Sequence, residues 1–288
     1  MGKYTLTLVV VVGALCSGCF IIENRLFPVW ERNDFDTPPT EPGPFQFEER
    51  RVEVEDGADG KPFGITVFAP KDASPPLPVF MWVMGSNVQA YYHQSLHEIL
   101  ASFGYLVLVP DTRPLRFADF NYHNRIVLLA EQTLDMAMAD EFGVEVDTDR
   151  IAAGGYSVGG PLAASLAARK QEVDALVHWA PSGAPFWQGI DAEALYPLVV
   201  QPSLYVLGEF DEDAPPEGGF PDAMQTAMTN APAEEVVIEG AVHHQFQQPT
   251  GADQFSGVAA ISRFEQQGRA IDITREWLDT LFANHAQR

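Results

Sequence analysis

The chain has 288 residues, 40 of them acidic and 17 basic, which gives a formal net charge of -23. This length suits one large domain or two small ones, and a hydrophobic content of 46% is enough for a substantial core, which excludes wholesale disorder. The negative charge disfavours nucleic acid and anionic membrane surfaces as partners, because both are bound through Lys and Arg. The two cysteines, Cys16 and Cys19, exclude a disulfide framework, a zinc ribbon or a catalytic thiol in the body of the protein.

The first nineteen residues indicate an export signal. Lys3 precedes an apolar run over residues 6–15, which is followed by the small residues Ser17 and Gly18 and then by Cys19. The Ser17-Gly18-Cys19 end resembles a bacterial lipobox, although Cys16 stands where lipoboxes usually carry Leu. The resemblance implies that residues 1–19 form a signal peptide with its lipobox, that Cys19 is lipidated and becomes the first mature residue, and that the protein is a membrane lipoprotein. Periplasmic or extracellular release, or an uncleaved anchor, are the alternatives.

Residues 20–46 are predicted to form a tether. Pro38, Pro39, Pro42 and Pro44 fall close together there, and prolines at this density prevent a helix or a central strand. A semi-extended segment between the export signal and a folded domain over residues 47–288 follows from this composition.

The body of the chain alternates predicted strands and helices. Strands are expected at 47–54, 63–68, 77–84, 105–109, 150–153, 173–179, 203–207 and 235–238, and helices at 92–102, 124–142, 161–169 and 271–282. The runs at 77–84 and 105–109 are continuously apolar, which is typical of strands buried on both faces. The pattern predicts an α/β fold with a mostly parallel sheet and helices on both faces.

A G-x-S-x-G motif, Gly155-Tyr156-Ser157-Val158-Gly159, lies between a predicted strand and a predicted helix. That context is the one a nucleophile elbow requires, in which glycines allow a sharp turn that exposes the serine hydroxyl. Ser157 is therefore the candidate nucleophile. The alternative is a glycine-rich turn of the kind found in any doubly wound fold.

A serine nucleophile needs a neighbouring base to take its proton. His243 and His244 follow the last predicted strand, at the kind of strand end where α/β active sites are built. One of these two is the candidate base. The histidines before the motif, at positions 93, 97 and 123, lie in helical or loop segments, and His178 lies in an apolar strand as a predicted core residue.

The base in turn needs an acid that orients it. Glu209, Asp211, Glu212 and Asp213 crowd the loop after the strand at 203–207, so position alone leaves the acid open. The order of serine, then acid, then histidine matches that of α/β-hydrolases.

Residues 47–282 resemble the α/β-hydrolase superfamily, with greatest similarity to dienelactone hydrolases, polyester hydrolases, cutinase-like lipases and platelet-activating-factor acetylhydrolases. Asp211-Glu-Asp-Ala-Pro resembles the acid motif of polyester hydrolases, and Gly240-Ala-Val-His243 resembles the base segment of the acetylhydrolases. The segment 261–267 before the last helix also resembles bacterial members. The resemblance implies a triad of Ser157, Asp211 and His243, with no metal or organic cofactor.

The oxyanion of such a reaction needs two N–H donors. One is expected from Val158, directly after the nucleophile, and the other from the loop after Met84. Resemblance to the polyester hydrolases implies Ser86 as the second donor, with Asn87 as the alternative.

Aromatic residues near these loops are candidates for a substrate pocket. Tyr91, Tyr92 and Trp187 could line it, although core packing explains each equally well. Residues 180–201 leave room for a short helix and loops but no large lid domain, and residues 245–262 are expected to form one wall of the cleft.

These features predict a serine hydrolase that cleaves small or polymeric carboxylic esters through an acyl-enzyme. An acyltransferase or peptidase with the same triad, or a non-catalytic surface lipoprotein on a hydrolase scaffold, are the alternatives, and the oligomeric state is open. Between Gln171 and Ser262 the chain has no Lys or Arg and 14 acidic residues. This is either an acidic, salt-adapted surface or a negative field around the cleft that disfavours anionic esters.

Overall fold

The computed structural model describes residues 38–58, 60–84, 90–111, 121–183, 190–249 and 257–285. The expected export signal, including Cys19, lies outside the described residues, as do Ser86, Asn87 and Trp187.

Within the described residues, eight strands form a single sheet in the order β1-β2-β4-β3-β5-β6-β7-β8. The strands are β1 (Phe47–Val54), β2 (Phe63–Pro70), β3 (Leu77–Trp82), β4 (Leu106–Pro110), β5 (Val146–Tyr156), β6 (Ala175–Trp179), β7 (Ser203–Gly208) and β8 (Ala233–Ile238). Neighbours from β4 to β8 are parallel, whereas β1 and β2 form an antiparallel pair and β2 is antiparallel to β4. The mostly parallel sheet predicted from the sequence is confirmed.

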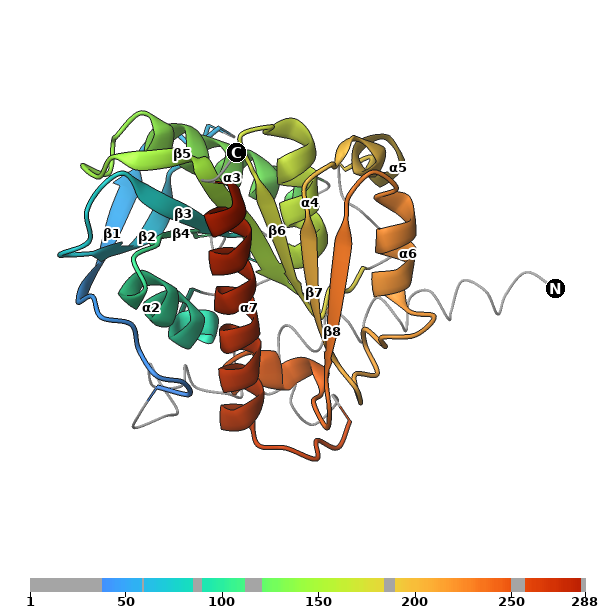
Figure 1. Ribbon diagram of the computed structural model, residues 1–288. Coiled ribbons are helices and arrows are strands. Elements are labelled where there is room, and N and C mark those ends of the chain that lie inside the picture. Colours follow the sequence, from blue (N-terminus) through green and yellow to red (C-terminus); the bar gives the residue numbers. More distant parts are fainter. Residues whose placement is uncertain are drawn as a thin grey trace, which may run out of the picture.

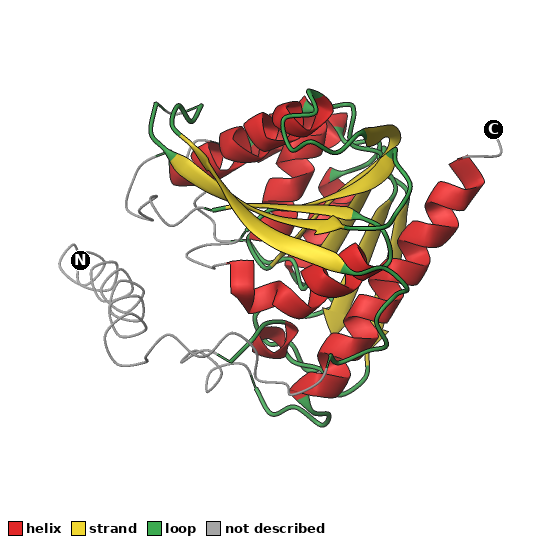
Figure 2. Ribbon diagram, turned by 90° about the vertical axis from the view of Figure 1, so that its left-hand side faces the viewer, coloured by secondary structure: helices red, strands yellow, loops and turns green. Residues whose placement is uncertain are grey.

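Helices cover both faces of this twisted sheet (Figures 1 and 2). They are η1 (Ala90–His93), α2 (Gln94–Ser102), α3 (Tyr122–Met138), α4 (Gly159–Arg169), α5 (Ala192–Leu195), η2 (Tyr196–Leu198), α6 (Phe220–Ala227), η3 (His243–Phe246) and α7 (Arg263–His285). Helices α2 and α7 pack on one face, and α3, α4 and α6 pack on the other. In the described ranges, no helix combines the length and apolar character needed to cross a membrane.

The sequence of the central strand β3 is continuously apolar because both faces of the strand are buried. Val79 and Met81 belong to the core under α3 and α4, whereas Phe80 and Trp82 belong to the core under α2 and α7. Successive side chains of a strand point to opposite faces, so a strand covered on both sides must be apolar at every position.

Some helices differ from the sequence-based expectation. Helix α3 ends at Met138, because Asp140 adopts a left-handed φ of 59° that stops the helix before the predicted end at 142. Helix α7 begins at Arg263, two turns earlier than predicted. Its first turns lack an apolar pattern because the side chains that they bury include the polar Gln266 and Gln267. Helix α6 was not predicted, because it has only eight residues, of which Pro221 and Met224 alone are buried, and it follows a loop rich in Pro and Gly.

Residues 38–46, the part of the proline-rich segment that the structure describes, lie on the surface of α2 and α7. The Thr40 hydroxyl donates to Asp272 at 2.6 Å, and the Phe45 amide donates to the Ser102 carbonyl at 3.0 Å. The Pro39 carbonyl lies so close to Gly268 that a Cβ there would approach it to 2.4 Å. These residues therefore pack against the domain.

The sheet order also places the functional segments together. β4 and β5 lie on opposite sides of β3, so the direction of winding reverses there, and ligands of open α/β sheets bind beyond the carboxyl ends of the strands near such a point. Ser157, Asp211 and His243 follow β5, β7 and β8, and so all three lie at this edge.

Candidate active site

Ser157 stands on a sharp turn between β5 and α4. Its φ of 53° is in the left-handed region, which a serine adopts only at a cost in free energy. A Cβ at Gly155 would lie 2.3 Å from the Gly159 carbonyl, so that position requires glycine. The Ser157 amide donates to the Trp179 carbonyl of β6 at 2.9 Å. This is the geometry expected of a nucleophile elbow.

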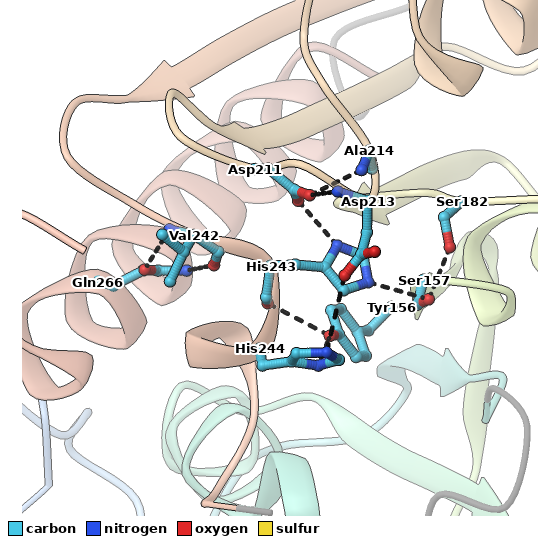
Figure 3. A network of polar contacts seen from close by, with 10 residues as sticks. All are labelled: Tyr156, Ser157, Ser182, Asp211, Asp213, Ala214, Val242, His243, His244 and Gln266. Atoms are coloured by element: carbon cyan, nitrogen blue, oxygen red, sulfur yellow. Dashed lines mark hydrogen bonds and ion pairs between the residues drawn. The ribbon is translucent and has the colours of Figure 1, made fainter. Parts of the chain in front are cut away.

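His243 connects Ser157 to Asp211 (Figure 3). The His243 Nδ1–H donates to Asp211 Oδ2 at 2.8 Å, and Nε2 lies 3.2 Å from Ser157 Oγ. Because Nδ1 carries the proton of the neutral imidazole, Nε2 is free to accept the serine proton. The structure thus brings His243 rather than His244 to the candidate nucleophile, and Asp211 rather than Glu209 to the imidazole.

Asp211 is buried and held by its own loop. Its Oδ1 accepts from the amides of Asp213 at 2.9 Å and Ala214 at 2.7 Å, while its Oδ2 faces His243. Both carboxylate oxygens are therefore hydrogen-bonded, and the side chain is fixed in the orientation that His243 uses.

The loop that carries His243 is tied to α7 by Gln266. The fully buried Gln266 side chain donates from Nε2 to the Val242 carbonyl at 2.7 Å and accepts from the Val242 amide at 3.1 Å. A second tie joins the Gly240 amide to Glu209 at 2.9 Å. Gln266 lies in the segment 261–267, whose similarity to bacterial hydrolases was noted from the sequence, but its part in positioning the histidine loop was not predicted.

Tyr156, His244 and Asp213 form a second layer beside His243. The Tyr156 ring packs against the His243 ring at 5.0 Å between centroids, and its hydroxyl donates to the His243 carbonyl at 3.2 Å. His244 Nδ1 lies 3.4 Å from the same hydroxyl, and His244 Nε2 lies 3.6 Å from the Asp213 carboxylate. The second histidine of the pair therefore packs beside the candidate base.

A hydroxyl that sequence reasoning missed contacts the candidate nucleophile. Ser182 Oγ lies 2.8 Å from Ser157 Oγ, on the side of Ser157 away from His243 (Figure 3). The only signal in the sequence is that Ser182 closely follows β6, the strand beside β5, at the carboxyl edge of the sheet.

Of the other predicted site residues, the structure describes Val158, Tyr91 and Tyr92. Val158 directly precedes the first turn of α4, at a helix N-terminus whose dipole favours negative charge. Tyr91 and Tyr92 lie in η1 with their rings 4.5 Å apart between centroids, and the Tyr92 carbonyl accepts from the Gln248 amide, which places η1 beside the histidine loop. The predicted second donor Ser86 and the pocket residue Trp187 lie outside the described residues.

Four other histidines are buried, at positions 93, 97, 123 and 178. Desolvation lowers the pKa of His93 and of His178 to about 3 and that of His123 to about 4, and it also lowers the pKa of His97. They are neutral at pH 7. His178 lies in the core on β6, as its position in an apolar predicted strand indicated.

Within the described part of the chain, one group of side chains comes close enough to share a metal ion. Asp211, Asp213 and His243 offer ligand atoms that all lie within 4.8 Å of one another. Asp211 and His243 already hydrogen-bond each other, and the other Asp211 oxygen accepts two backbone amides. The arrangement fits a hydrogen-bonded acid–histidine pair with an exposed carboxylate beside it.

The fold and the elbow at its carboxyl edge define the chain as an α/β-hydrolase. The family model described as chlorophyllase matches residues 37–181, half of the 288-residue chain, and the protein belongs to the chlorophyllase family. The match includes Ser157 but ends before Asp211 and His243. The superfamily predicted from the sequence is confirmed, and the chlorophyllase family was not among the branches named there.

A solved structure supports the same fold. The crystal structure of a putative dienelactone hydrolase from Klebsiella pneumoniae subsp. pneumoniae MGH 78578 aligns with a TM-score of 0.57 and 18% identity, over 81% of this chain and 99% of that one. No curated protein matches the chain.

Proposed function

We propose that the protein hydrolyses carboxylic esters through an acyl-enzyme formed on Ser157. The observation that carries the proposal is the continuous line of contacts from Ser157 Oγ to His243 at 3.2 Å and from His243 to Asp211 at 2.8 Å, on a strained elbow. Each group has the role that its partners allow: Ser157 is nucleophile, His243 is general base and then general acid, and Asp211 orients the imidazole.

In acylation, Ser157 Oγ bonds to the acyl carbon while its proton passes to His243 Nε2. The tetrahedral intermediate collapses, and His243 gives that proton to the departing alcohol. In deacylation, water attacks the acyl carbon and its proton goes to His243, which then returns a proton to Ser157 Oγ as the carboxylic acid leaves. The Val158 amide and a donor from the loop after Met84, for which we propose Ser86, stabilise the oxyanion.

Two features favour an enzyme over a non-catalytic protein on a hydrolase scaffold. A binding scaffold gains nothing from a serine held at φ 53° with its hydroxyl against a buried histidine, and strain of this kind persists where function uses it. The Asp211 carboxylate is also fully hydrogen-bonded in the orientation that catalysis needs.

The test is hydrolysis of p-nitrophenyl esters by the wild type and by Ser157→Ala. The variant should lose activity by about three orders of magnitude or more while keeping the melting temperature of the wild type. Ser165→Ala is a matched control, because Ser165 lies two turns into α4 with its hydroxyl on the Pro161 carbonyl. If Ser157→Ala still hydrolysed these esters at the wild-type rate, Ser157 would not be the nucleophile and the proposal would be wrong.

The substrate class is tested by measuring kcat/KM on a series of esters that differ in acyl length and in the size of the alcohol. The panel includes chlorophyll, because the family takes its name from an enzyme of that compound. Added alcohols distinguish hydrolysis from acyl transfer through the products formed, and peptide substrates test the peptidase alternative.

A further inference from the structure

A second hydroxyl contacts the proposed nucleophile in addition to the base (Figure 3). Ser182 Oγ is 2.8 Å from Ser157 Oγ, which is shorter than the 3.2 Å from Ser157 Oγ to His243 Nε2. Ser182 is half-buried, so its hydroxyl lies at the edge of the site.

The backbone holds Ser182 in this place. Ala180, two residues earlier, has a left-handed φ of 42°, and its amide donates to the Val206 carbonyl at 2.8 Å. The Ser182 amide donates to the Ser157 carbonyl at 3.2 Å, so both the backbone and the side chain of Ser182 contact the elbow. Strained non-glycine residues at two adjoining turns, Ser157 and Ala180, are a common feature of functional sites.

The count of protons sets the direction of the hydroxyl contact. Ser157 has one hydroxyl proton, and it points to His243 Nε2 when the base is ready to accept it. Ser182 must then donate its own proton to a lone pair of Ser157 Oγ. The Ser157 oxygen is thus both a donor to the base and an acceptor from Ser182.

We infer that Ser182 is a further catalytic residue, which stabilises the negative charge that develops on Ser157 Oγ as this atom gains or loses its bond to the acyl carbon. The inference rests on the proposed function. In acylation the Ser157 proton goes to His243 while the new C–O bond forms, and in deacylation the same bond breaks and the proton returns. Ser182 keeps its own proton in both steps and supplies only a hydrogen bond, so the balance of the reaction is unchanged.

The expected effect follows from the strength of such a bond. A hydrogen bond to a charged acceptor is about twice as strong as one to a neutral acceptor. The contact therefore strengthens between the ground state and the transition state, and only this difference accelerates the reaction. Removing the Ser182 hydroxyl should slow both acylation and deacylation about tenfold and leave KM for the ester within about twofold.

The test compares Ser182→Ala, Ser182→Thr and the control Ser165→Ala with the wild type. Two rates are measured: the burst of p-nitrophenol from an activated ester, and the inactivation by a fluorophosphonate, which reports the reactivity of Ser157 without the ester's leaving alcohol. We expect both rates to fall about tenfold in Ser182→Ala, to recover in Ser182→Thr, which retains a hydroxyl, and to stay unchanged in Ser165→Ala. Melting temperatures separate a folding defect from a loss of reactivity.

Each outcome addresses one claim. If the wild type is not modified at Ser157, the proposed function fails and Ser182 has no reaction to assist. If the wild type is modified and Ser182→Ala reacts as fast or faster, the role of Ser182 is overturned while the proposed function stands. A slower reaction in Ser182→Ala that Ser182→Thr does not restore would assign Ser182 a packing role and would also overturn the inference.

Discussion

Replacing Gln266 with methionine tests how the fold positions the proposed catalytic histidine. Gln266 bonds both the amide and the carbonyl of Val242, the residue directly before His243, and both residues are buried. Methionine has nearly the same length as glutamine, so the change removes the two hydrogen bonds and leaves the volume similar.

The magnitude follows from the groups left without a partner. The Val242 amide and carbonyl would each lose a buried hydrogen bond, at about 1–3 kcal/mol apiece, so Gln266→Met should lower the free energy of unfolding by about 2–6 kcal/mol. The freed loop also lets the imidazole move relative to Ser157. A displacement of about 1 Å at a reacting group costs up to about a hundredfold in rate, so kcat should fall about 10- to 100-fold while KM changes less.

The assays are urea denaturation and steady-state ester hydrolysis. Gln267→Met is the matched control, because the buried Gln267 makes one longer bond, at 3.3 Å, to the Gln245 carbonyl. It should lose less than half as much stability as Gln266→Met and keep kcat within about threefold. Equal effects of the two substitutions, or a wild-type kcat in Gln266→Met, would refute the positioning role of Gln266.

Two further predictions concern protonation and charge. Burial lowers the pKa of His97, so below about pH 6.5 the unfolded chain binds a proton that the folded chain does not, and the free energy of unfolding decreases as the pH is lowered. His97→Phe should therefore lessen the decrease in unfolding free energy from pH 7 to pH 5 by about 1–2 kcal/mol, and denaturation curves with the same pH dependence as the wild type would contradict this. Asp213→Asn should raise kcat/KM of an anionic ester relative to its neutral analogue about two- to tenfold at low salt, because the exposed Asp213 carboxylate lies beside His243 and Asp211. Glu172→Gln, which makes the same charge change at the opposite end of the sheet, should leave that ratio unchanged, and an equal response would show that only net charge matters.

The central strands of the sheet were predictable because they are short apolar runs between turn residues. The runs at 77–84 and 203–207 contain all of β3 and most of β7, whereas β1, which coincides with the expected range of 47–54, is a partly exposed strand of mixed polarity. Burial on both faces leaves a clear pattern in a sequence. The first turns of α7 leave a weak one, since Gln266 and Gln267 are polar residues buried by partners far along the chain, and α6 is too short, at eight residues, to repeat its pattern.

The residues of the candidate site that follow directly after a strand were predictable from the sequence. Ser157, Asp211 and His243 follow three different strands that the parallel order brings to one edge, and motif resemblance selected them among neighbours of the same type. The contacts of Ser182 and Gln266 could not be predicted in the same way. Each depends on a contact with a residue of another segment, 25 residues away for Ser182 and 24 for Gln266, and serine and glutamine give no local pattern.

The most direct test of the proposed triad is to locate the covalent adduct of a fluorophosphonate by mass spectrometry of the digested protein. We expect one adduct per chain, on Ser157, which forms in the wild type and fails to form at a comparable rate in His243→Ala. An adduct on another serine, no adduct on native protein, or equal labelling in His243→Ala would contradict it.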